Sequence, residues 1–131
     1  MFELDTRLAN DSFEVCEYLD CKILVMNNST TPWFIIVPFT AKTEWYELDD
    51  SVQYNINKIT NKLSKFIKDE YKVDKLNVAT IGNVVKQLHI HIVGRFERDP
   101  AWPSPVWGNL EDKPYTEEQK YSLIEKINNF L

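Results

Sequence analysis

The sequence contains little glycine, cysteine or histidine, and each shortage limits the kinds of site that the protein can form. Its 131 residues include three glycines, two cysteines and two histidines. Four residues separate Cys16 from Cys21, which is not the spacing of a zinc-binding pair. Thiols inside cells stay reduced, so we expect both cysteines to be small, half-buried residues of strands.

Long apolar runs and an excess of positive charge are also missing. No run approaches the roughly 20 apolar residues that span a bilayer, and the first residues lack the basic and apolar regions of a secretory signal. The 15 lysines and arginines face 20 aspartates and glutamates, which gives a formal charge of −5 and a sequence pI of about 5.0. Nucleic acids and anionic membranes are not expected as partners, because both need a basic face. A cytoplasmic protein with a small-molecule ligand fits this composition.

The length and the apolar pattern predict one domain over residues 1–131. Residues 14–18 and 22–26 indicate the two strands of a hairpin, with Leu19 and Asp20 at its turn. Residues 34–37 indicate a buried strand that Pro38 stops.

Two helices and two further strands are predicted beyond this point. Asp49 and Asp50 supply capping residues for an amphipathic helix that runs to about Tyr71. Residues 76–81 and 88–96 indicate strands, and a capping box at residues 116–119 opens a last helix. This order predicts an α+β fold, in which an antiparallel sheet of about five strands carries a central long helix and a C-terminal helix.

Both histidines lie in one predicted strand. Side chains alternate between the two faces of a strand, so Gln87, His89 and His91 share one face. The residues between them, Leu88 and Ile90, face the core. Two imidazoles on a rigid strand with a packed apolar back form a well-held site.

Three interpretations of the two histidines are open. They are structural residues with ordinary hydrogen bonds, they bind a metal together with Glu97 or Asp99, or one of them attacks a phosphoryl group. Zinc needs three or four ligands, and neither acidic residue stands at a ligand spacing, which disfavours the metal. A neutral imidazole is nucleophilic near pH 7, and a carbonyl at its second nitrogen fixes the tautomer. We therefore favour the nucleophile.

The residues before the histidines offer contacts to a phosphate. Gly82 and Asn83 form a short turn, where glycine permits close approach and backbone N–H groups can donate to an anion. Asn83 serves this site, the turn itself or both. Asn77 interrupts an otherwise apolar strand, where asparagine is disfavoured, and is a second candidate.

The segment after the histidines, residues 98–115, is long and rich in proline and tryptophan. Loops of this length usually have a function. Arg95 and Arg98 meet distal phosphates or form surface salt bridges. Trp102 and Trp107 stack near a base or close an interface, and we favour the interface, where aromatic residues are enriched.

The histidine strand resembles a known signature. Residues 87–92, Gln-Leu-His-Ile-His-Ile, resemble the motif of the histidine-triad (HIT) family, in which three histidines alternate with apolar residues. Residues 82–86 resemble the turn that introduces this motif, and residues 24–28 and 32–38 resemble the first block of the family. The resemblance extends from residue 13 to residue 107 and is nearest to a bacterial branch with a Gln-Leu-His-φ-His motif, φ being apolar.

The resemblance implies a homodimer that cleaves nucleoside monophosphate conjugates at the α-phosphate. His89 matches the histidine that forms a nucleotidyl intermediate, and His91 matches the histidine that contacts the phosphate. The remaining matches are a ribose contact at either Asn27 or Asn28 and a phosphate site at Asn77, Gly82 and Asn83. The family holds no metal or cofactor of its own, although a divalent ion can arrive with a polyphosphate substrate.

Three positions depart from the family pattern. Gln87 replaces the first histidine and keeps a hydrogen-bonding group that carries no proton, so it stays a candidate catalytic residue. Val84 replaces a serine or threonine, and Trp33 replaces a further histidine, which predicts two lost polar contacts. At about 1 kcal/mol each, these losses slow turnover about ten- to thirtyfold. The resemblance predicts a hydrolase or transferase, with a weakly catalytic nucleotide-binding module acting through protein partners as the alternative.

Overall fold

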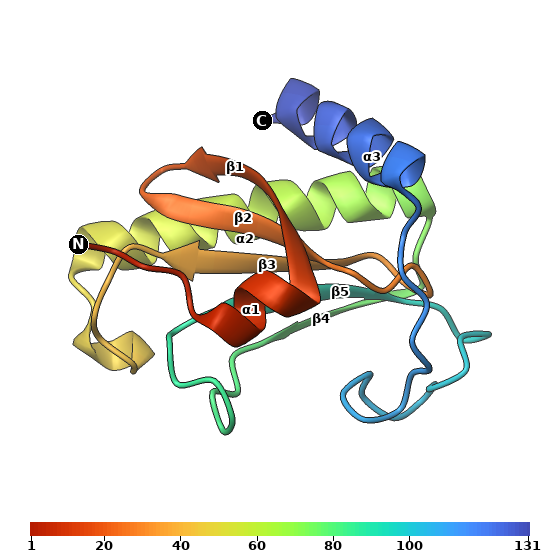
Figure 1. The fold of residues 1–131 in the computed structure, drawn as a ribbon, viewed down its shortest axis with the longest axis horizontal. Coiled ribbons are helices and arrows are strands. Elements are labelled where there is room, and N and C mark those ends of the chain that lie inside the picture. Colours follow the sequence, from red (N-terminus) through yellow and green to blue (C-terminus); the bar gives the residue numbers. More distant parts are fainter.

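The computed structural model describes all residues from 1 to 131, and its centre is a five-stranded antiparallel sheet in the order β1-β2-β3-β5-β4 (Figure 1). The strands are β1 (Ser12–Tyr18), β2 (Cys21–Met26), β3 (Trp33–Pro38), β4 (Lys75–Ala79) and β5 (Ile90–Arg95). The two most buried strands, β3 and β5, pair from Ile36 opposite Ile90 to Trp33 opposite Val93. The predicted α+β fold is confirmed.

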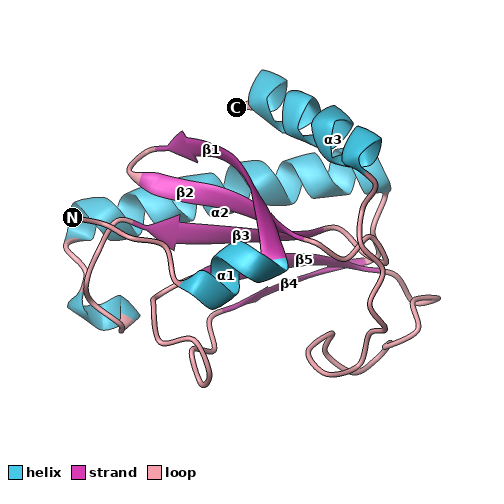
Figure 2. Ribbon diagram, viewed as in Figure 1, coloured by secondary structure: helices cyan, strands magenta, loops and turns pink.

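Helices cover both faces of this sheet unequally. The long helix α2 (Asp50–Tyr71) and the last helix α3 (Glu117–Phe130) lie on one face, while the short helix α1 (Thr6–Asp11) lies on the opposite face (Figure 2). A 3₁₀ turn, η1 (Trp45–Glu47), precedes α2. None of the helices combines the length and apolar character that crossing a membrane requires.

The larger part of the core lies between the sheet and the two longer helices. It is built mainly of isoleucine, leucine, valine and phenylalanine. Ile90 and Ile92 of β5 meet Ile59 and Leu63 of α2 in this cluster, and all four are fully buried. A smaller cluster on the opposite face contains Trp33, Ile35 and Val37 of β3 together with residues of α1 and of the 98–115 segment. The site described below lies on this second face.

Most predicted elements are present, with shifts of a few residues at their ends. The hairpin turns at Leu19 and Asp20, both in the left-handed region with φ of 48° and 59°, as tight hairpins require. The capping box at residues 116–119 is formed, and both cysteines are free thiols in neighbouring strands. Helix α1 and the turn η1 were not predicted, because each is too short to show an apolar period.

Gly94 sets the distance between β5 and the helix layer. A Cβ atom built on it would lie 2.6 Å from Val73 Cγ1 and 2.7 Å from Ile67 Cγ2 and Pro32 Cγ. Its N–H donates to the Pro32 carbonyl at 2.8 Å. The absence of a side chain here therefore lets the histidine strand pack directly against α2 and the segment that follows it.

We predict that Gly94→Ala lowers the free energy of unfolding by about 2–3 kcal/mol, because an extra methyl group in a filled core displaces its neighbours. Urea denaturation measures this change. Gly108→Ala is the control: Gly108 has φ of +75° but open space around it, so only backbone strain of about 1 kcal/mol is expected. A Gly94→Ala protein within about 0.5 kcal/mol of wild type would contradict this interpretation.

Candidate functional site

Strand β5 is buried along its whole length, and its two faces have different chemistry. Ile90, Ile92 and Gly94 face α2, whereas His91, Val93 and Arg95 face the other side of the sheet. His89 immediately precedes the strand and is also buried. The polar groups of the second face lie out of water, so each needs a protein partner.

The ring of His89 is oriented by the main chain. Its Nδ1 lies 2.6 Å from the carbonyl oxygen of Gln87, and this short distance requires Nδ1 to carry the proton and donate. In the neutral ring Nε2 then bears a lone pair. His89 is 5% exposed, with its ring centroid 4.8 Å from that of His91. The geometry thus leaves a single nucleophilic nitrogen beside a second imidazole.

His91 has the opposite tautomer. The indole Nε1–H of Trp33 donates to His91 Nδ1 at 2.9 Å, so the proton of the neutral ring is on Nε2. Burial lowers the pKa of His91 to about 3, with a smaller contribution from the neighbouring His89. The expected loss of a polar contact at Trp33 is therefore wrong, because the indole supplies a donor in place of a histidine.

Trp107 completes the surroundings of His91. Its ring packs edge-on against His91, with centroids 5.0 Å apart, and against Trp33, with centroids 5.6 Å apart. Trp107 thus packs on site residues of its own chain, and the interface role expected for it stays a prediction. Trp102 also has a partner within the chain, since its ring lies 5.7 Å from the Arg95 guanidinium. Both contacts were beyond sequence reasoning, because no local pattern links tryptophans of a loop to a strand.

A cavity of about 530 Å³ lies next to Trp33. It is lined by residues of β2, α1 and the 98–115 segment, including Asn10, Asn27, Asn28, Val106 and Leu110. Asn28 uses both ends of its amide, donating to the Glu111 carbonyl and accepting from the Thr30 N–H. Asn27 accepts from the Tyr115 N–H at 2.9 Å, and its Nδ2 has no partner. Of the two candidate ribose contacts, Asn27 keeps both of its N–H donors free, whereas Asn28 has already used one of its two.

The turn before the histidines is exposed. Gly82 has φ of +67°, a conformation that favours glycine, and Asn83 makes no side-chain hydrogen bond. Val84 is 72% exposed, while Val85 packs against the smaller cluster. This turn and α1 border a further cavity of about 590 Å³, lined by Val84, Val85 and Arg7 among others.

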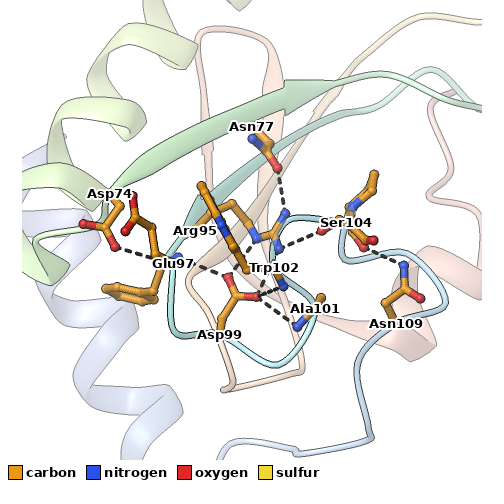
Figure 3. Close-up of polar contacts among 11 residues, drawn as sticks. Asp74, Asn77, Arg95, Glu97, Asp99, Ala101, Trp102, Ser104 and Asn109 are labelled. Carbon is orange, nitrogen blue, oxygen red and sulfur yellow. Dashed lines mark hydrogen bonds and ion pairs between the residues drawn. The ribbon is translucent and has the colours of Figure 1, made fainter.

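Arg95 is enclosed by acceptors and does not reach solvent (Figure 3). Its Nε and Nη2 donate to the two carboxylate oxygens of Asp99 at 2.9 and 3.0 Å, its Nη1 to Asn77 Oδ1 at 3.0 Å, and its Nη2 also to the Ser104 carbonyl at 2.8 Å. Arg95 is therefore neither a contact for distal phosphates nor part of a surface salt bridge, and Asn77 is joined to it. Arg98 lies over the Phe96 ring at 4.3 Å.

Asp99 ties the start of the loop to this arginine. Its carboxylate accepts from the backbone N–H groups of Phe96, Ala101 and Trp102. Burial alone would raise the pKa of Asp99, but the hydrogen bonds from Arg95 and from the backbone outweigh it and leave the pKa below its usual value. The pair thus fixes the loop that carries Val106 and Trp107 over the site.

Nowhere in the chain do three His, Cys, Asp or Glu side chains gather in a way that suits a metal ion. The two imidazoles stand together, whereas Asp99 is engaged with Arg95. Of the candidate residues, the structure brings together His89 and His91. The side chain of Gln87 points to the N-terminal segment, where its amide bonds the backbone of Glu3 and Asp5.

This strand, its two imidazoles and the covering loop belong to a recognised class of protein. The model of the HIT domain matches residues 7–98, and the chain belongs to the histidine-triad (HIT) family.

Solved structures show the same fold. A histidine triad protein from Marinobacter aquaeolei is 42% identical, with 100% of this chain and 96% of that chain covered and a TM-score of 0.94. One from Sinorhizobium meliloti is 35% identical, with 100% and 98% covered and a TM-score of 0.94. A diadenosine triphosphate hydrolase from Plasmodium falciparum, in complex with cyclomarin A, is 20% identical over 98% of this chain and 81% of that chain, with a TM-score of 0.63, and shares the fold. No curated protein matches the chain.

We predict that Arg95→Met lowers the free energy of unfolding by about 3–5 kcal/mol, because it leaves a buried carboxylate without its counter-ion. Chemical denaturation measures this, and adding Asp99→Asn should recover part of the loss. Lys65→Met is the matched control, since Lys65 and Asp69 form an ion pair with the same spacing that is exposed and screened by water, so its loss should lower the free energy of unfolding far less. Equal losses of unfolding free energy in Arg95→Met and Lys65→Met would contradict the structural role of Arg95.

We also predict a pH dependence that originates in His91. In the unfolded chain its imidazole binds a proton near pH 6.5, but in the folded protein it stays neutral down to about pH 3. The unfolded state thus binds more protons in this interval. The contribution of His91 to the free energy of unfolding is therefore constant above pH 6.5 and decreases below it, by up to about 1.4 kcal/mol per pH unit. The difference between wild type and His91→Gln in urea denaturation should show this slope. If the unfolding free energies of wild type and His91→Gln changed with pH in parallel, His91 would not be the origin of the pH dependence.

Proposed function

We propose that this protein is a nucleotide hydrolase or transferase that cleaves a nucleoside monophosphate conjugate at its α-phosphate through a nucleotidyl-His89 intermediate. One observation carries the proposal: the two adjacent imidazoles are held in opposite tautomers. Gln87 O fixes the proton of His89 on Nδ1, and the Trp33 indole fixes that of His91 on Nε2. A nucleophile and a hydrogen-bond donor therefore stand side by side, which is what attack on a phosphoryl group requires.

The reaction proceeds in two steps. His89 Nε2 attacks the α-phosphorus while the bond to the leaving oxygen or nitrogen breaks, and the leaving group departs with a proton from solvent. The ring becomes a cationic N-phosphoryl imidazole, whose remaining N–H is stabilised by the Gln87 carbonyl. Water then attacks the phosphorus, releases the nucleoside monophosphate and regenerates neutral His89. His91, with its depressed pKa, acts as a neutral donor to the phosphate oxygens and not as an imidazolium acid.

The nucleoside occupies the cavity beside Trp33. The free Nδ2 of Asn27 donates to a ribose hydroxyl, and Trp33 and Val106 provide apolar contacts for the base. The turn at Gly82 and Asn83 holds phosphate oxygens with its backbone N–H groups. Membership of the HIT family and the name of the Plasmodium falciparum relative, a diadenosine triphosphate hydrolase, support a nucleotide substrate. A homodimer in the cytoplasm, free of bound metal apart from ions brought by a polyphosphate, belongs to the same proposal.

Two observations favour the alternative of a binding module with little turnover. His89 and His91 are only 5% and 4% exposed, and the Val84 side chain brings no hydroxyl to the phosphate. A site this closed, and short of one donor, holds a nucleotide more readily than it processes one. Calorimetry with AMP separates the two functions: micromolar binding without turnover of any conjugate supports the module.

We predict that His89→Ala lowers AMP release from adenosine 5′-phosphoramidate by about a thousandfold or more, because the nucleophile is lost. The assay is chromatography of the products, with diadenosine polyphosphate as second substrate. An alkaline quench followed by mass spectrometry should trap an adenylyl group on His89 in the wild type and none in the variant. His91→Gln should form the same adduct more slowly.

Two outcomes would contradict the catalytic proposal. Equal AMP release by wild type and His89→Ala would show that His89 is not the nucleophile. An adenylyl group found on another residue would identify that residue as the nucleophile in place of His89. Lys65→Met, far from the site, is the control for handling and folding.

A further inference from the structure

The side chain of Gln87 holds the N-terminal segment by two hydrogen bonds. Its Nε2 donates to the Glu3 carbonyl at 2.9 Å, and its Oε1 accepts from the Asp5 N–H at 2.8 Å. These two peptide groups flank Leu4, so the amide pairs with the segment as a neighbouring strand would. The residue that stands in place of the first histidine of the triad is thus engaged away from the phosphate.

The segment held in this way is packed along its length. Phe2, Leu4 and Leu8 contact the smaller apolar cluster on the face of the sheet that carries the histidines. The Phe2 ring also lies 4.7 Å from that of Phe39. Asp5 caps α1 by accepting from the Arg7 N–H at 2.8 Å. The bonds of Gln87 therefore lie at the point where the segment leads into helix α1.

The far end of this segment is a wall of the nucleotide cavity. Asn10 and Asp11, the last residues of α1, line the cavity of about 530 Å³ together with Asn27 and Trp33. The Asp11 carbonyl also accepts from the N–H of Asn27 at 2.9 Å. This hydrogen bond connects the wall to Asn27, whose Nδ2 has no partner within the chain.

We propose that Gln87 is a positioning residue, which shapes the nucleotide cavity by holding residues 3–11 in place; this inference rests on the function proposed above. An imidazole at this position could not meet both peptide groups, because its two nitrogens point in different directions, whereas a primary amide has its donor and acceptor on one planar group. The contact that orients His89 comes from the main-chain carbonyl of residue 87 and survives any side-chain change. Residue 87 therefore acts on nucleotide binding, and the chemistry of His89 does not depend on its side chain.

The test compares Gln87→Met, which keeps the length and loses both hydrogen bonds, with Gln87→His. Trypsin cleavage after the exposed Arg7 reports on the segment without any nucleotide, and should be accelerated about fivefold or more in both variants, as expected from two lost hydrogen bonds. The calorimetric Kd for AMP should weaken about five- to tenfold, and KM for adenosine 5′-phosphoramidate should rise by a similar factor. The kcat should stay within about twofold of wild type, because the His89 bond remains.

Gln119→Met is the matched control. Gln119 also uses its amide to accept a backbone N–H, that of Thr116 at 2.9 Å, at the start of α3. This variant should lose stability without any change in cleavage at Arg7, in Kd or in KM.

The results that would overturn the proposal are specific. Wild-type cleavage after Arg7 in both Gln87 variants would show that the amide does not hold the segment. Faster cleavage with an unchanged Kd would show that the segment is no wall of the site. A fall in kcat with unchanged KM would make Gln87 part of the chemistry. If the wild type binds AMP but turns over no conjugate, the catalytic function fails, and the cleavage and Kd comparisons still decide the role of Gln87.

Discussion

The burial of β5 on both faces is the constraint on which the rest of the structure depends. On the helix side this constraint is met by apolar residues and a glycine. On the other side the strand and the residue before it carry two imidazoles and a guanidinium, and a buried polar group without a partner is costly. Each is satisfied from a different part of the chain: His89 by the main chain of Gln87, His91 by Trp33 of β3, and Arg95 by Asp99 and Asn77.

These partners also select the tautomers on which the proposed chemistry depends. A histidine in water exchanges between two tautomers and a cation near neutral pH. Here one acceptor and one donor from the protein each select one tautomer of a neutral ring, and burial keeps His91 uncharged. The same hydrogen bonds that satisfy the strand thus select a lone pair on one ring and an N–H on the other. The contacts that stabilise the strand are therefore also the contacts on which the proposed reactivity rests.

Much of the fold followed from local pattern, whereas the site did so only in part. The helix at Asp50–Tyr71, the hairpin around Leu19 and the capping box at Thr116 each have a signal within a few residues. The shared setting of the two histidines came from the period of the strand. The partners did not, because Trp33 and His91 are 58 residues apart and no local rule joins them.

Of three other errors, two had the same origin. Arg95 was expected to meet distal phosphates or to form a surface salt bridge, but it is buried beneath the loop that carries Asp99 and Ser104. Helix α1 is six residues long and has no period to detect. The hydrogen bonds of the Gln87 amide could not be predicted, because their partners in the N-terminal segment lie 82 and 84 residues away in the sequence. Non-local packing decided the cases of Arg95 and Gln87, whereas the short length of α1 decided the third.

Gly94 has a consequence for how such a protein can diversify. Since β5 rests on α2 without a side chain between them, the strand that carries the imidazoles has no room to shift towards the helix layer. The opposite face is covered by two segments from distant parts of the chain, residues 1–11 and the 98–115 loop. Under the proposed function, new substrate preferences would therefore arise in these two covers, through altered length or side chains, while β5 beneath them is retained.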